Sequence, residues 1–325
     1  MELFYAPYQL VPKTQLNKKT LSKQPRTGIL LKIQKNKWVG YSDLHPWPEL
    51  GDQVLEDHIK AFLQQAPSFL GCVTMAQACW DGDARAAHKS LVSEEPLLKN
   101  NLLVSDLDLL TEHFLALNKK LGFEVIKLKA GRDLEKELFY CKKILDTGNF
   151  GLRLDFNSTL EWNTFQKFFE SIPTKYIEYA EDPLPYSVEV WSEAQKFIPL
   201  ALDFEARKIS WQKHEKPVAQ VLIIKPQRMN MEAVLSCVNA WKIKFTVTSS
   251  MDHPLGVVQA YSWAQELQQK FSKQSLSPGC LTLDVFEKTK YHSEILVTGP
   301  FIKSIPGSGS GFKKLLEGES WIPLQ

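Results

Sequence analysis

The sequence lacks the features of several protein classes. Its 325 residues contain no apolar run long enough to cross a bilayer, and 39 Lys+Arg against 37 Asp+Glu leave a formal net charge of only +2. A charge this small and evenly spread does not favour nucleic acid or an anionic membrane surface as a partner. With 44% hydrophobic residues, the chain is also too apolar to be disordered. We therefore expect a globular protein that acts on a small molecule, and nothing in the sequence requires it to be more than a monomer.

Cysteines are few, and their spacing pairs none of them. The chain has five cysteines and no C-x-x-C motif, which argues against a disulfide framework or a structural zinc site. Each cysteine can still be a core residue or a single reactive thiol. The segment from Met1 to Phe4 lacks the basic and apolar regions of a secretory signal. The glycine-rich run at 306–311 has neither of the common phosphate-binding spacings. These absences predict a cytoplasmic protein without a nucleotide cradle.

Two kinds of pattern divide the chain. The first ninety-odd residues mix a strand at 28–33 with helix-spaced apolar positions at 52–65, which predicts a compact α+β unit. From residue 100, short apolar runs alternate with helical stretches, as in βα units around a parallel sheet. About eight strands are expected, which is the number of a barrel: Leu102–Val104, Val125–Lys129, Leu152–Asp155, Tyr176–Glu181, Leu200–Asp203, Val221–Lys225, Phe245–Ser250 and Leu281–Asp284.

Charged residues recur at the carboxyl ends of these strands. Because alternate residues of a barrel strand face inward, Lys127 and Lys129 should point into the barrel while their apolar neighbours pack on helices. The same alternation turns Arg153, Asp155 and Asn157 inward on the next strand. Barrel enzymes place their active sites at this end of the strands. The sequence therefore predicts a polar site at the barrel mouth.

Five successive strands each contribute one charge to this mouth. The residues lie 22 to 26 positions apart, about one βα unit each, and are Lys129, Asp155, Glu181, Asp203 and Lys225. Three converging carboxylates would repel one another unless a hard cation lies between them, and oxygen ligands of this kind suit Mg²⁺ best. We predict Mg²⁺ bound by Asp155, Glu181 and Asp203.

Lysines on either side of such an ion suit the removal of a proton next to a carboxylate, because the metal stabilises the enediolate that forms. The lysine that acts as base must first be neutral, and at a reference pKa of about 10.4 this costs roughly 4–5 kcal/mol at pH 7. A second ammonium nearby and the dication both lower that cost. Lys127 is placed to supply the second ammonium for Lys129.

The full set of motifs resembles a known superfamily. K-x-K at 127–129, D-x-N at 155–157, E-D-P at 181–183, the acid at Asp203 and K-P at 225–226 follow the order and spacing of the enolase superfamily, in its muconate-lactonizing subgroup. Within that subgroup the chain looks most like the o-succinylbenzoate synthases of menaquinone biosynthesis. The resemblance implies an α/β fold, a (β/α)7β TIM-like barrel at 99–290, and an α+β capping domain at 1–98 with a C-terminal return at 291–325.

The resemblance also implies roles for individual residues. Lys129 would remove the proton and then assist loss of hydroxide on the same face, and Lys225 would stay charged and stabilise the enediolate from the other side. Mg²⁺ would be the cofactor, with Mn²⁺ as a substitute. Lys127, Arg153 and Asn157 would support the site, whereas Thr248, Ser249, Ser250 and Gly279 match positions that contact the succinyl part of a small carboxylate substrate. The expected reaction is a syn-dehydration that yields 2-succinylbenzoate.

The sequence leaves three alternative functions open and departs from the family pattern at one supporting acid. The same half-reaction could end in racemisation, as in N-acylamino acid racemases or dipeptide epimerases, although the latter carry D-x-D where this chain has only Asp284. A Schiff-base lysine in a barrel would make the three carboxylates redundant. A binding protein without turnover would not need the complete set. In addition, Phe204 separates Asp203 from Glu205 where relatives have adjacent acids, which puts a supporting acid in doubt.

Overall fold

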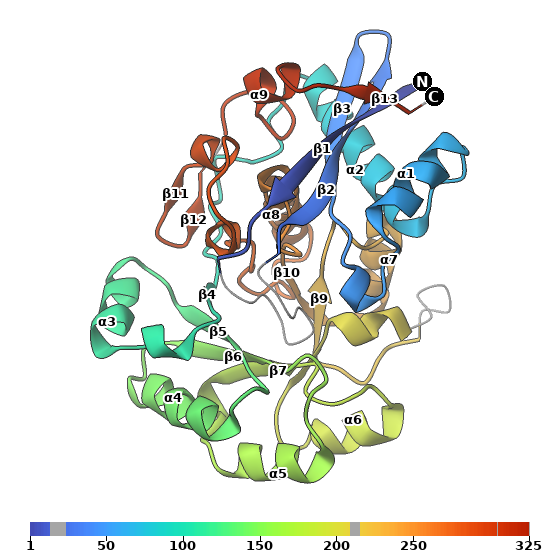
Figure 1. The fold of residues 1–325 in the computed structure, drawn as a ribbon. Helices are drawn as coiled ribbons and strands as arrows, with labels where there is room; N and C mark the ends of the chain where they lie inside the picture. The colour runs from blue at the N-terminus through green and yellow to red at the C-terminus, as the bar shows by residue number, and fades with distance from the viewer. Residues whose placement is uncertain (14–23, 209–214, 304, 325) are drawn as a thin grey trace.

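The computed structural model describes residues 1–13, 24–208, 215–303 and 305–324, and Figure 1 shows their arrangement. A curled parallel sheet with helices outside it lies below an antiparallel sheet that carries both chain ends. Within the described residues, no helix is both long and apolar enough to span a membrane.

The upper unit is built on a four-stranded antiparallel sheet in the order β13-β1-β2-β3. Its strands are β1 (Glu2–Leu10), β2 (Arg26–Lys35), β3 (Trp38–Leu44) and the short β13 (Ile322–Pro323). Helices α1 (Leu55–Leu63) and α2 (Phe69–Ala86) cover this sheet, and apolar side chains such as Ile29, Leu31 and Leu70 form the core between them. The structure confirms the predicted strand at 28–33 and helix at 52–65. Since β13 pairs with β1, the C-terminal segment returns to this unit.

The lower unit contains a seven-stranded sheet whose neighbours are all parallel, in the order β10-β9-β8-β7-β6-β5-β4. The strands are β4 (Leu102–Val104), β5 (Val125–Lys129), β6 (Gly151–Asp155), β7 (Ile177–Glu181), β8 (Leu200–Leu202), β9 (Val221–Ile224) and β10 (Lys244–Val247). Helices cover the outside of the curl (Figure 1): α3 (Glu112–Lys120), α4 (Leu134–Asp146), α5 (Trp162–Glu170), α6 (Val188–Ala194), α7 (Met231–Trp241) and α8 (Pro254–Lys270).

The strand alternation follows the expected pattern. Leu152, Leu154 and Phe156 are completely buried, and Phe156 packs edge-on against the rings of Phe168 and Phe169 on α5. The intervening polar residues therefore face the interior of the curl. This is why a strand with three apolar residues still delivers Asp155 to the mouth.

The predicted eighth strand, Leu281–Asp284, is wrong. Leu283–Val285 is a turn of 3-10 helix, and the strand-like alternation of Leu281 and Leu283 arises because both pack against the core from an irregular loop. The eighth position is filled a few residues earlier, where Ser275 bridges to Phe245 and Gly279 to Thr248 beside β10.

The same segment also reaches the other end of the sheet. The Asn101 N–H donates to the Pro278 carbonyl at 2.8 Å, and the Cys280 N–H donates to Asn100 Oδ1 at 2.8 Å. Residues 275–280 thus lie between β10 and the start of β4, and they close the sheet into a barrel. The (β/α)7β architecture holds, with an irregular closing segment in place of a regular last strand.

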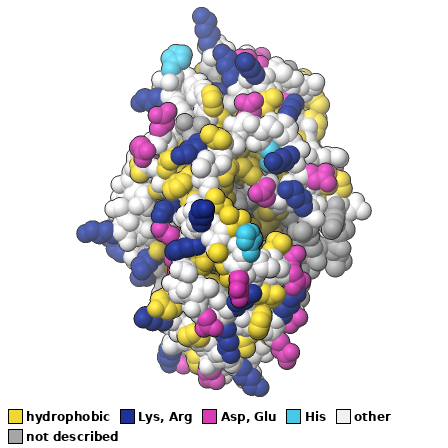
Figure 2. All heavy atoms as spheres, turned by 90° about the vertical axis from the view of Figure 1, so that its left-hand side faces the viewer, with side chains coloured by type: hydrophobic (Ala, Val, Ile, Leu, Met, Phe, Trp, Pro, Cys, Tyr) yellow, Lys and Arg dark blue, Asp and Glu magenta, His cyan; other side chains and the backbone are white. Residues whose placement is uncertain are grey.

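The remaining elements link the two units. After the barrel come β11 (Val297–Thr298), β12 (Phe301–Ile302) and α9 (Lys313–Glu317). Buried polar contacts join the units, for example at Gln77 of α2, whose side-chain amide donates a hydrogen bond to the Pro226 carbonyl after β9 at 3.0 Å. The surface in Figure 2 mixes Lys and Arg with Asp and Glu, and hydrophobic side chains gather toward the centre of that face. The domain limits at 98 and 290 remain a prediction.

Candidate active site at the barrel mouth

The parallel register places the predicted charged residues next to one another. Lys129 is paired with Asp155 across β5 and β6, and Asp155 with Glu181 across β6 and β7. Asp203 and Lys225 directly follow β8 and β9, the next two strands of the sheet. The three acidic strands therefore lie between the two lysine strands, so Lys129 and Lys225 flank the carboxylates from opposite sides.

Lysine ammonium groups hold two of the carboxylates directly. Lys127 Nζ lies 2.6 Å from Glu181 Oε2 and 3.0 Å from Asp155 Oδ2, and Lys129 Nζ lies 2.5 Å from the same Asp155 oxygen. Asp155 and Glu181 are at most 2% exposed. Burial alone would lower the pKa of Lys127, but the carboxylates of Asp155 and Glu181 outweigh it and raise that pKa well above its ordinary value. Lys127 therefore stays charged.

The pKa values of Asp155 and Glu181 shift in opposite directions. Burial tends to raise the pKa of Asp155, but the ammonium groups of Lys127 and Lys129 outweigh it, and the pKa is lowered. Burial, followed by the negative charge of Asp155, raises the pKa of Glu181 to about 8. A negative charge on Glu181 is therefore costly, first because the carboxyl is buried and then because Asp155 is ionised beside it.

On the far side, Lys225 Nζ lies 2.5 Å from Asp203 Oδ2. The position of Asp203 depends on a residue that the sequence interpretation did not single out. The carboxylate of Asp182 accepts hydrogen bonds from the backbone N–H groups of Asp203, Phe204 and Glu205, at 3.0, 2.7 and 3.2 Å. Asp182 is itself buried at a positive φ of 37°. The E-D-P motif at 181–183 was the available signal, since its second acid follows directly after the strand end.

Glu205, whose role the sequence left in doubt, is also engaged. Its carboxylate accepts a hydrogen bond from the Tyr186 N–H at 3.1 Å and one from the Ser158 hydroxyl at 3.3 Å. It is buried and lies beside the loop that follows β7. Glu205 therefore braces neighbouring strand-end loops even though Phe204 separates it from Asp203.

The residue types at the mouth fit a hard divalent cation. Asp155, Glu181 and Asp203 offer carboxylate oxygens only, the ligands that Mg²⁺ prefers. The raised pKa of Glu181 shows that a negative charge here is costly without further positive charge, which a dication would supply. The ammonium groups of Lys127, Lys129 and Lys225 lie against these oxygens, and among the described residues the three acids do not form a cluster with ligand atoms within 4.8 Å of one another.

Asn157 and Arg153 lie at two different depths. Asn157 Nδ2 donates to Asp155 Oδ1 at 3.0 Å, so the amide orients that carboxylate from the strand end. Arg153 is fully buried inside the barrel, where Nε donates to Glu178 Oε2 at 2.7 Å and Nη1 donates to Asn101 Oδ1 at 3.0 Å and to the Ser277 carbonyl at 2.8 Å. Arg153 thus connects β6 to the closing segment rather than facing the mouth.

The four predicted substrate-contact residues lie along the last part of the barrel. Thr248 bridges to Gly279, and the Ser249 hydroxyl lies 2.6 Å from that of Thr282. The hydroxyls of Thr248 and Ser250 are buried without a hydrogen-bond partner among the described residues. Unpartnered buried hydroxyls are costly and mark places where a ligand or water completes the bonding. A Cβ on Gly279 would lie 2.9 Å from Asn101 Oδ1, so the closing segment passes very close to β4.

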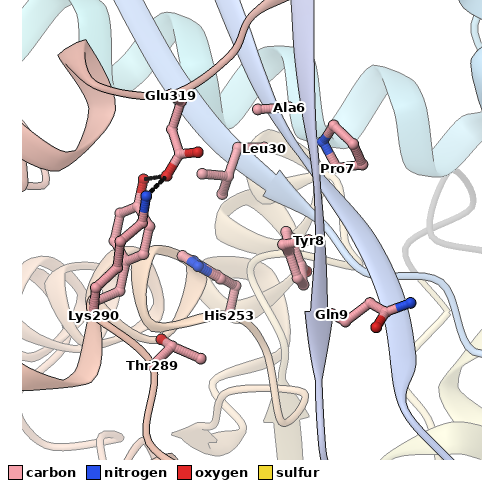
Figure 3. A pocket seen from close by; sticks show the side chains of 10 residues that line it. Ala6, Pro7, Tyr8, Gln9, Leu30, His253, Thr289, Lys290 and Glu319 are labelled. Carbon is pink, nitrogen blue, oxygen red and sulfur yellow. Dashed lines mark hydrogen bonds and ion pairs between the residues drawn. The ribbon is translucent and has the colours of Figure 1, made fainter.

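Two further features contain none of the lysines Lys127, Lys129 and Lys225. Asp43, His45 and Asp252 are buried, and their side chains bring one ligand atom each within 4.8 Å of one another. A cavity of about 180 Å³ lies beside β1, and Figure 3 shows Tyr8 and His253 on its wall. Neither feature includes any of the predicted catalytic or metal-binding residues.

Known proteins resemble this chain at the level of sequence and of fold. The family described as "O-succinylbenzoate synthase, N-terminal domain" matches residues 3–86. An o-succinylbenzoate synthase of Bdellovibrio bacteriovorus is 36% identical over 335 aligned positions, which cover 100% of this chain and 99% of that protein. An o-succinylbenzoate synthase of Yersinia pseudotuberculosis is 23% identical over 81% of this chain and 84% of its own length.

Among solved structures, a muconate lactonizing enzyme from Mycobacterium smegmatis, solved with muconolactone, has a TM-score of 0.79 at 12% identity and covers 98% of this chain and 99% of its own. A dipeptide epimerase from Cytophaga hutchinsonii, solved with Mg and a dipeptide, has a TM-score of 0.75 at 17% identity, over 100% of this chain and 99% of its own. At such identities these structures establish the fold alone.

Proposed function

The chain belongs to the o-succinylbenzoate synthase family, and on that premise we propose that it catalyses the Mg²⁺-dependent syn-dehydration of 2-succinyl-6-hydroxy-2,4-cyclohexadiene-1-carboxylate to 2-succinylbenzoate. The product is aromatic, so aromatisation of the existing ring drives the reaction. The proposal places the enzyme in menaquinone biosynthesis and in the cytoplasm. It also assigns the mouth to a barrel domain at 99–290, with a cap at 1–98 and 291–325.

The observation that carries the proposal is the order of charges across the sheet. Lys129 and Lys225 flank three acidic strand ends from opposite sides, and each amine already contacts the carboxylate next to it. A substrate lying over the carboxylates would present one face to each amine. This arrangement suits removal of a proton on one face and stabilisation of the resulting anion from the other.

Asp155, Glu181 and Asp203 would hold Mg²⁺, which when bound supplies positive charge to the enediolate form of the substrate carboxylate. Lys129 acts as the base that takes the proton, and then as the acid that returns it to the departing hydroxide. Lys225 stays charged and stabilises the enediolate from the other side. Lys127, held by Glu181 and Asp155, supports the site beside Lys129.

The alternative of a dipeptide epimerase is less well supported. Those enzymes use a pair of acids near the last strand to hold an amino group, and this chain has only Asp284 there. The Asp284 side chain is 96% exposed and lies on a 3-10 turn outside the barrel, next to Lys13. It is therefore not placed to bind an ammonium group in the mouth.

The direct test is an ultraviolet assay with the cyclohexadiene substrate, with Mg²⁺ and after removal of metal by EDTA. We expect Lys129→Ala and Lys225→Ala each to abolish turnover, whereas Lys142→Ala, on the exposed surface of α4, leaves it unchanged. Full activity in metal-free protein, or in either mouth variant, would contradict the mechanism. Inversion of an N-acylamino acid with uptake of solvent deuterium, without dehydration, would favour the racemase alternative instead.

A further inference from the structure

A second group of buried titratable side chains lies where the cap meets the barrel. Asp43 is in β3 of the cap, and Asp252 is in the loop between β10 and α8 of the barrel. Their side chains are 1% and 4% exposed, and a carboxylate oxygen of each lies within 4.8 Å of the other and of a His45 nitrogen. The sequence interpretation assigned no role to either acid.

Hydrogen bonds tie both carboxyls to the two units. Asp43 accepts one from the Tyr8 hydroxyl of β1 at 2.5 Å and one from the His253 backbone N–H at 2.9 Å. Asp252 accepts one from the Ser250 N–H at 2.8 Å, next to the predicted substrate-contact positions. The rings of Tyr8 and His253 also pack against each other, tilted by 43° with centroids 4.6 Å apart, and Figure 3 shows both at the pocket.

The first turn of α8 closes over the pair without spare room. A Cβ on Gly256 would lie 2.8 Å from Asp43 Oδ2 and 2.8 Å from the Asp252 Cβ. Two ionised carboxylates at this separation, away from bulk water, repel each other by several times the thermal energy. Something must therefore neutralise one of them.

The neighbouring cations are already engaged with other acids. Arg26 pairs with Glu49, Arg228 with Asp52, and Lys225 with Asp203. The imidazoles do not help either: burial, together with Arg26 and Arg228, lowers the pKa of His45 to about 3, and burial lowers the pKa of His253 well below its ordinary value.

The acids respond as expected for a crowded pair. Burial, and then the charge of Asp252, raises the pKa of Asp43 well above its usual range. Burial raises the pKa of Asp252 to about 6, although Lys225 and Arg228 pull it down. Burial raises the pKa of Tyr8 well above 10, so its hydroxyl stays a donor. The imidazoles therefore stay neutral and the tyrosine stays protonated, so only the two carboxyls are left to take up a proton.

We propose that Asp43 and Asp252 hold one proton between them at neutral pH, and that this neutralised pair fixes cap strand β3 to the barrel loop that carries Ser249 and Ser250. The proton belongs to the pair rather than to one residue. Both acids are positioning residues: they touch no substrate, but they set where the cap lies over the substrate-contact loop.

The test is the pH dependence of urea unfolding for wild type and Asp252→Asn, without metal, at pH 5, 6, 7 and 8. An amide copies the protonated acid and cannot lose a proton. A raised folded-state pKa stabilises the protein below the ordinary pKa, and that stability is lost as pH rises toward the raised value. The folding constant of Asp252→Asn relative to wild type should therefore rise by up to tenfold per pH unit, and then level off once the wild-type pair has lost its proton.

Comparing Asp252→Asn with wild type cancels the pH dependence of stability that other buried acids such as Glu181 contribute. Asp284→Asn, which removes an exposed carboxylate, should show a constant ratio to wild type over the same range. If Asp252→Asn does not fold, Asp43→Asn gives the same comparison. A ratio that does not change with pH would refute the shared proton, whatever the outcome of the turnover assay.

A bound cation is the competing explanation for the same cluster. Addition of Mn²⁺ or Zn²⁺ would then stabilise wild type at pH 8 but not Asp252→Asn, and this result would also overturn the proposal. We expect each ion to change the stability of wild type and of Asp252→Asn against urea by the same amount.

Discussion

Arg153 gives the sharpest structural prediction, because its buried guanidinium ties three parts of the barrel together. It links Glu178 at the start of β7, Asn101 before β4, and the closing segment through the Ser277 carbonyl. In Arg153→Met the unbranched apolar chain fills the space of the methylenes, but all of these hydrogen bonds are lost. Glu178 is partly exposed and can regain water, whereas Asn101 is buried and cannot.

Leaving the buried Asn101 acceptor without its donor costs about 1–3 kcal/mol, and loss of the charged hydrogen bond to the Ser277 carbonyl adds about 1.5–3 kcal/mol, for a total of about 2.5–6 kcal/mol. We expect Arg153→Met to lose about this much free energy of unfolding, measured by urea denaturation or as a fall in Tm of several degrees. Arg132→Met, at an exposed position, should change stability by less than about 0.5 kcal/mol. A stable Arg153→Met protein with a raised KM alone would refute this role and would instead indicate that Arg153 contacts the substrate.

Two further predictions concern the residues around the mouth. Asp182→Asn offers only one acceptor oxygen to three backbone N–H groups, so it should misplace Asp203 and weaken Mn²⁺ affinity about 10–100-fold, measured by equilibrium dialysis. The surface variant Asp108→Asn should bind Mn²⁺ as wild type does. Equal Mn²⁺ affinities of Asp182→Asn and wild type would contradict the positioning role of Asp182. Gly279→Ala forces a Cβ against Asn101 and Thr248, so it should cost about 1–3 kcal/mol of stability and also lower kcat/KM; an unchanged Tm would show that the closing segment tolerates the shift.

Much of the barrel could be predicted because its strands carry a strong local pattern. The predicted strand Val125–Lys129 matches β5 at both ends, because Ile126 and Leu128 alternate with Lys127 and Lys129 as a barrel strand requires. The last strand could not be predicted in the same way. The segment at 275–280 is held by bonds to β10 and to Asn100 and Asn101, which are distant in sequence, while the apolar pattern four residues later belongs to a loop packed on the core.

The site residues also divide into those that a local sequence pattern predicts and those that it does not. Strand-end charges at regular spacing revealed Lys129, Asp155, Glu181, Asp203 and Lys225 as neighbours, because parallel register brings equivalent positions together.

The supporting residues depend on contacts that no spacing encodes. Asp182 acts through the backbone of a different strand end, and Asp43 meets Asp252, 209 positions later in the sequence, at the junction of two units. Arg153 was expected at the mouth, but its length carries its guanidinium inward to the closing segment.

The central claim is that a divalent ion binds among Asp155, Glu181 and Asp203, with the amines of Lys129 and Lys225 on either side. The most direct measurement is the anomalous scattering of Mn²⁺ in crystals of the protein. We expect one strong peak within coordination distance of those three carboxylates. A peak at Asp43, His45 and Asp252 instead, or none at the barrel mouth, would contradict it.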